Sequence, residues 1–76
     1  MSRWTPCKRR DFIRRLRAPG FDGPLPGTRH SFMIYERHRL AIPSNTEYSV
    51  DQVRMMMAEV EAILGRGVTA AEWGRL

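Results

Sequence analysis

The sequence predicts a small α+β domain in which a helix is followed by three strands, a second helix and a short extra helix. Two amphipathic stretches with helical periodicity lie on either side of short segments rich in aromatic and β-branched residues. The chain has 76 residues, enough for one thin hydrophobic core, and no linker divides it. We therefore expect a single domain spanning residues 1–76.

The first helix is predicted to begin at Thr5-Pro6, with the threonine as N-cap and the proline at the first helical position. Ala18-Pro19-Gly20 should end it. Its apolar face holds three residues, Phe12, Ile13 and Leu16. Its other side holds three arginines, Arg10, Arg14 and Arg17. At 100° per residue these arginines fall within about 60° of one another, and guanidinium groups suit phosphates.

Three stretches between the helices have the composition of strands: Phe21–Leu25, Ser31–Glu36 and Arg39–Ile42. The last two predict a hairpin that turns at Arg37-His38. In that register Glu36 lies opposite Arg39 as a favourable cross-strand pair. Pro43 should close the second strand of the hairpin.

The second helix is predicted to begin at a capping box, with Ser49 as N-cap and Gln52 reaching back to it. Apolar residues then recur at spacings of three and four: Val50, Val53, Met57, Val60 and Leu64. Gly65 should end the helix. A second capping box, Thr69 to Glu72, predicts a short final helix carrying Trp73. That tryptophan either folds back on the domain or marks an interface.

The charge of the chain is strongly asymmetric. Its 13 Lys and Arg residues against 8 Asp and Glu residues give a net charge of +5. Residues 1–17 contain seven of the basic residues and a single acid, Asp11, whereas residues 18–76 carry six arginines against seven acids. The N-terminal segment is therefore a candidate contact surface for a polyanion. A solvated basic helix face is the alternative interpretation.

Cysteine, histidine and apolar content exclude several classes of protein. Cys7 is the single cysteine, so an intrachain disulfide is impossible, and one thiol with two dispersed histidines makes no zinc site. No apolar run approaches the roughly 18 residues of a membrane span. Residues 3–17 are too charged for the core of a signal peptide. We expect a cytoplasmic protein that uses no metal and no cofactor.

The motif Gly27-Thr28-Arg29-His30 stands directly before a run of strand formers. Pro24 and Pro26 stiffen the approach to it, and Gly27 supplies backbone freedom for a turn. His30 then emerges where the strand begins. A neutral imidazole at a strand edge can accept or donate a proton near pH 7. A structural or merely exposed histidine is the alternative.

Followed by alternating apolar residues, a basic turn, Leu40-Ala41-Ile42-Pro43 and an amphipathic helix, this motif resembles the HicA family of toxins. Those are small bacterial mRNA interferases of type II toxin–antitoxin systems. The resemblance spans Lys8 to Gly65 and implies an α-β-β-β-α sandwich like a double-stranded RNA-binding domain. It places the domain core in residues 8–65 and makes residues 66–76 a C-terminal extension.

The resemblance further implies a metal-independent mRNA endoribonuclease in which His30 is the catalytic acid/base. It implies two partners, mRNA and a cognate antitoxin of the HicB type, and a second copy of the chain is a further candidate partner.

The residues themselves suggest which groups would bind RNA. Arg29 is a candidate for the charge on the scissile phosphate, with Thr28 beside it. The three arginines of the first helix are candidates for backbone phosphates. The predicted register also places Asn45 opposite His30. It puts His38 at the hairpin tip, roughly 25 Å away, too far to act on the same phosphate.

Two other classes of function stay open. The first is a non-catalytic RNA-binding module on the same fold, which would bind with a steep salt dependence but would not cleave. The second is a protein-interaction domain that uses the segment Met55-Met56-Met57 and the tail around Trp73. Those methionines are interpreted first as core or its rim, because methionine fills core gaps as readily as it adapts to partners.

Overall fold

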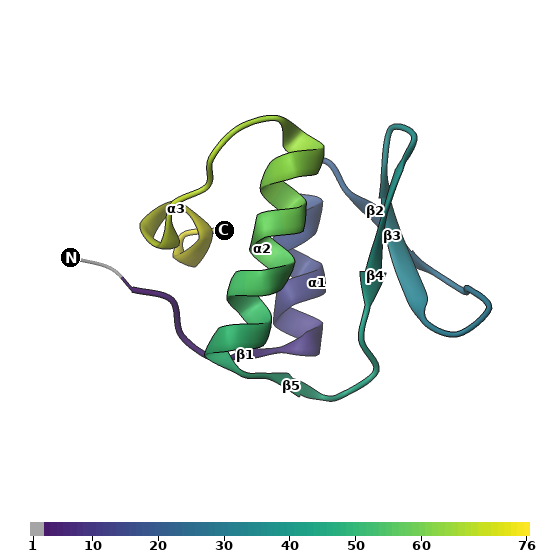
Figure 1. Cartoon of the computed structure of the whole chain (residues 1–76), viewed down its shortest axis with the longest axis horizontal. Helices are drawn as coiled ribbons and strands as arrows, with labels where there is room; N and C mark the ends of the chain where they lie inside the picture. Colours follow the sequence, from purple (N-terminus) through teal and green to yellow (C-terminus); the bar gives the residue numbers. More distant parts are fainter. Residues whose placement is uncertain (1–2) are drawn as a thin grey trace.

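Two helices lie next to each other along one side of a three-stranded sheet in the computed structural model, which describes residues 3–76 (Figure 1). The elements are, in order, β1 (Cys7–Lys8), α1 (Arg9–Arg17), β2 (Asp22–Leu25), β3 (Ser31–Tyr35), β4 (His38–Ile42), β5 (Glu47–Tyr48), α2 (Val50–Leu64) and α3 (Ala70–Gly74). The predicted α+β class and the order helix, three strands, helix, short helix are confirmed. Residues 1–2 of the predicted domain lie outside the described residues.

The sheet has the strand order β2-β3-β4 and is antiparallel throughout. Tyr35 pairs with His38, so the hairpin turns at Glu36 and Arg37 rather than at the predicted Arg37-His38. Glu36 adopts a φ of 55°, in the left-handed region that tight hairpin turns use. As a result Arg39 lies opposite Ile34, and the predicted pair of Glu36 with Arg39 is wrong.

The start of α1 differs from the prediction because the preceding residues pair with a distant part of the chain. Cys7 pairs with Tyr48 in a second, two-stranded sheet formed by β1 and β5. The backbone N–H of Arg9 then donates to the carbonyl of Thr46 over 2.9 Å. The N-cap is Lys8, with an extended backbone and no side-chain cap. The predicted start at Thr5-Pro6 is therefore wrong.

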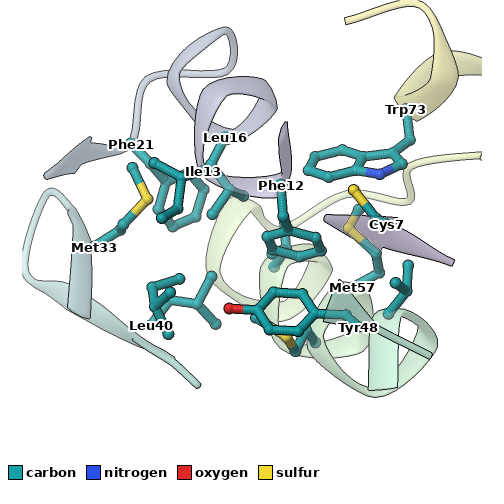
Figure 2. Packing of buried hydrophobic residues seen from close by; sticks show 14 of the residues in the cluster. Cys7, Phe12, Ile13, Leu16, Phe21, Met33, Leu40, Tyr48, Met57 and Trp73 are labelled. Atoms are coloured by element: carbon teal, nitrogen blue, oxygen red, sulfur yellow. The ribbon is translucent and has the colours of Figure 1, made fainter. Parts of the chain in front are cut away.

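The core lies between the helices and the inner face of the sheet (Figure 2). The predicted apolar face of α1 is confirmed, since Phe12, Ile13 and Leu16 are all buried. Trp73 folds back onto the domain, where it is only 3% exposed and its ring centroid lies 4.9 Å from that of Phe12. The core thus joins residues from both ends of the chain.

The predicted ends of α2 are confirmed. The hydroxyl of Ser49 accepts a hydrogen bond from the backbone N–H of Gln52 over 3.2 Å, and Gly65 ends the helix with a φ of 73°. The buried residues of α2 are Val53, Met56, Met57 and Val60. Two of the three consecutive methionines therefore belong to the core. Within residues 3–76, no helix has the length and apolar character that a membrane crossing requires.

Candidate functional site

His30 ends the connection between β2 and β3, residues 26–30, which we call the His30 loop. Its side chain is exposed. The backbone of Gly27 packs so closely against the carbonyl oxygen of His30 that a Cβ on residue 27 would overlap that oxygen. The φ of Gly27 lies outside the left-handed region. Gly27 is therefore needed for the space it leaves, not for the backbone freedom that the sequence suggested.

Thr28 and Arg29 are exposed beside His30, so the three candidate residues of the motif lie together. Their side chains make no hydrogen bond or ion pair with any other residue among residues 3–76. They are consequently free to contact a ligand. By the same observation, no second acid/base side chain is bonded to the imidazole.

The backbone across from His30 is that of Pro43. Ser31 pairs with Ile42, so the residue before Ser31 faces the residue after Ile42. The predicted neighbour, Asn45, is instead bonded to the side chain of Gln52 through two hydrogen bonds of 2.9 and 3.2 Å. Asn45 is thus tied to the start of α2, and its predicted position opposite His30 is wrong.

Two partly buried hydrogen bonds hold the backbone at Pro43. Its carbonyl oxygen accepts a hydrogen bond of 2.7 Å from the hydroxyl of Tyr48 and one of 3.1 Å from Nε of Arg9. Burial raises the pKa of Tyr48 above its ordinary value, against the opposing effect of Arg9, so the hydroxyl keeps its proton and donates. The end of β4 beside the His30 loop is therefore held by groups from β5 and α1.

A second cation that the sequence reasoning missed lies close to the loop. Met33 and Leu40 are buried against the helices, so Phe32 and Arg39 point to the outer face of the sheet. The guanidinium carbon of Arg39 lies over the ring of Phe32, 4.6 Å from its centroid. A Cβ on Gly27 would lie 3.3 Å from that same ring. Arg39 was missed because the predicted hairpin register was wrong; the correct register pairs Arg39 with Ile34 and places it near Phe32.

The three arginines of α1 are exposed as predicted, but each already has a neighbour. The Nε atoms of Arg10 and Arg14 both lie 4.0 Å from a carboxylate oxygen of Asp11. Nη1 of Arg14 also donates to the carbonyl of Leu76 over 3.4 Å. Asp11 therefore neutralises part of the charge on this face, although exposed pairs of this kind are weak.

Only one of these arginines contacts the strand that leads to the His30 loop. Nη2 of Arg17 donates to the carbonyl of Gly23 in β2 over 2.9 Å. The β2–β3 connection itself extends away from α1, at the far edge of the molecule (Figure 1). The structure therefore gathers Thr28, Arg29 and His30 in one loop and leaves the arginine face of α1 as a separate basic surface.

His38 lies at the opposite end of the hairpin from His30. It is the first residue of β4 and pairs with Tyr35, the last residue of β3. Five residues of extended chain separate Tyr35 from His30, which corresponds to roughly 17 Å rather than the predicted 25 Å. The two histidines remain too far apart to act on one phosphate.

Comparison with known proteins gives no assignment: no family model matches the chain, and no curated protein or solved structure matches it either. The function has to be argued from the site itself.

Proposed function

We propose that this chain is a metal-independent mRNA endoribonuclease, the toxin of a type II toxin–antitoxin pair, with His30 as its acid/base. The observation that carries the proposal is the placement of His30. Its imidazole is exposed directly before β3 and is not bonded to any other side chain among residues 3–76, and the backbone of its loop contacts itself between Gly27 and His30. An acid/base group has to be reachable by its substrate, and the exposed side chain of His30 meets this condition, while the contact with Gly27 positions its backbone.

The proposed reaction is transfer of a phosphodiester to the adjacent 2′-hydroxyl group. The 2′-oxygen forms a bond to phosphorus, the bond from phosphorus to the 5′-oxygen breaks, and one proton moves from the first oxygen to the second. This movement needs two transfers, removal of the proton from the 2′-oxygen and donation of a proton to the 5′-oxygen, and His30 performs one of them. Water or a substrate oxygen performs the other, because within residues 3–76 no second acid/base side chain is bonded to the imidazole. We expect a slow enzyme as a consequence.

The negative charge of the phosphorane needs nearby cations. Arg29 is adjacent to His30 in the loop. Phe32 follows His30 by two residues, and the guanidinium group of Arg39 lies over its ring. We assign Arg29 to the scissile phosphate and Arg39 to a neighbouring one. The separate basic face with Arg10, Arg14 and Arg17 would bind more distant phosphates without sequence preference. In this proposal the protein is cytoplasmic and is neutralised by a cognate antitoxin that covers the His30 loop.

The test compares an RNA oligonucleotide with the same sequence carrying 2′-O-methyl groups, in the presence of a chelator. The proposal predicts cleavage of the RNA alone, with products ending in a 2′,3′-cyclic phosphate and a 5′-hydroxyl. Cleavage of the methylated strand, or products with a 5′-phosphate, would rule out attack by the 2′-oxygen.

The absence of a bonded acid/base partner for His30 among the described residues favours a second candidate, a non-catalytic RNA-binding module. That module would bind both strands with a steep salt dependence and cleave neither. The same experiment separates the two candidates, since binding is measured on the uncleaved strand.

A further inference from the structure

A second basic surface lies on the side of the molecule where the N-terminal segment meets α3 (Figure 1). There a pocket of about 310 Å³ is bordered by three arginines and two tryptophans: Arg3, Arg15, Arg75, Trp4 and Trp73. Among the residues that the structure describes, no Asp or Glu lines it. The acids closest in sequence to Arg15 and Arg75 are Asp11 and Glu72, and both lie next to other arginines. Asp11 lies beside Arg10, and Glu72 pairs with Arg66 over 3.0 Å.

Two residues that line this pocket, Arg15 and Trp73, each carry a buried donor without a bond among residues 3–76. Nε of Arg15 and Nε1 of Trp73 are both inaccessible, and neither has an acceptor among residues 3–76. Trp73 is only 3% exposed, and the guanidinium carbon of Arg15 lies 5.8 Å from the centroid of its ring. Buried donors are normally satisfied, because a donor left unpaired loses the hydrogen bonds it would make to water. Their presence in two residues of one pocket points to an acceptor that the described chain does not supply.

We propose that this pocket binds an oxyanion, and that its natural ligand carries a phosphate group. Three guanidinium groups with no carboxylate among them balance a doubly charged group better than a single carboxylate, and guanidinium donors match phosphate oxygens in pairs. The ligand bonds the exposed arginines, and Arg15 and Trp73 have to move before their buried donors can reach it. The phosphate belongs either to a small phosphorylated molecule or to a nucleic acid, which present the same chemistry.

This site is independent of the proposed ribonuclease. It shares no residue with the His30 loop, and it is formed by segments about 70 residues apart in the sequence, 3–5 and 70–75. Binding here would hold both ends of the chain against α1. A ligand that binds the folded state alone raises its stability by mass action.

The chain supplies its own probe, because its two tryptophans both border this pocket. Tryptophan emission is measured while sodium phosphate replaces sodium chloride at constant ionic strength. We expect a saturable change in the wild type and at least about tenfold weaker binding in Arg75→Gln, since a charge-assisted bond is lost. Arg15→Gln should act in the same direction. Arg54→Gln removes the same charge from an exposed position on α2 outside this pocket and should bind like the wild type.

Two further titrations identify the source of the phosphate. A mononucleotide that binds as tightly as an RNA oligonucleotide indicates a small ligand, whereas tighter binding of the RNA indicates a nucleic-acid backbone. His30→Ala should leave the phosphate and mononucleotide curves unchanged, which separates this site from the ribonuclease. Tryptophan emission that does not change with phosphate, with the mononucleotide or with RNA would overturn the proposal. An Arg54→Gln variant as impaired as Arg75→Gln would overturn it too, by showing that only net charge matters.

Discussion

Gly27 and His30 are in backbone contact: the carbonyl oxygen of His30 occupies the space where residue 27 would carry a Cβ. This contact sets the direction in which the chain leaves the His30 loop and enters β3. The position of His30, the proposed acid/base, therefore depends on residue 27 being a glycine.

The first prediction follows from that contact. In Gly27→Ala the new methyl group has to push the backbone at His30 away, so we expect RNA cleavage to fall by at least about tenfold, because small displacements of a catalytic group are costly. The fold should survive, since residues 26–30 are exposed. Gly74→Ala is the matched control, because a Cβ there has open space around it. Equal cleavage by both variants would show that the loop geometry is irrelevant.

The second prediction concerns two methionines of α2 that are two positions apart. Met57 is 1% exposed in the core, whereas Met55 is 60% exposed. Met57→Ala should lower the free energy of unfolding by about 2–5 kcal/mol, because it leaves a cavity. Met55→Ala should change it by less than about 0.5 kcal/mol. Urea unfolding followed by circular dichroism measures both, and a large loss for Met55→Ala would mean that its exposed side chain has a partner in solution.

The third prediction concerns the pH dependence of stability. Burial raises the pKa of the Cys7 thiol above its ordinary value of 9.0, against an opposing effect of Arg15. As the pH rises, the thiol of the unfolded chain therefore loses its proton before that of the folded chain. The stability linked to this group is complete below the ordinary pKa and is lost as the pH rises through the folded pKa.

Unfolding measured from pH 7 to 10.5 should thus show a decline above about pH 9 that is shallower in Cys7→Ala. Tyr48, whose pKa is raised mainly by burial and to a lesser degree by the charge of Cys7, adds a further decline at higher pH in both proteins, which is smaller in Cys7→Ala. Parallel curves for the two proteins would contradict the assignment of this decline to Cys7.

Local signals in the sequence were sufficient for the buried face of α1 and for both ends of α2. The apolar face of α1, the cap at Ser49 and the end of α2 at Gly65 all depend on residues within a few positions of one another. The side chain of Gln52 is an exception, because Asn45 competes for it and it does not reach back to Ser49.

The sequence predictions failed where distant segments meet. The start of α1 depends on the pairing of Cys7 with Tyr48, some forty residues away, which no local pattern reveals. The hairpin register depends on Glu36 accepting a positive φ, which is uncommon for a residue with a side chain. The turn lies one residue earlier than predicted, so each residue of β3 pairs two positions earlier in β4. This change places Arg39 next to Phe32 and Pro43 opposite His30, and it leaves Asn45 out of the site.

The most direct test of the central claim measures the rate of RNA cleavage by the wild type, His30→Ala and His38→Ala with a chelator present. Both substitutions remove one exposed imidazole from the same hairpin, so their effects on charge and stability should be similar. We predict that His30→Ala abolishes cleavage while it keeps RNA binding, and that His38→Ala cleaves within about threefold of the wild type, because a surface change away from the reaction costs little. Cleavage by His30→Ala at the wild-type rate would contradict the account.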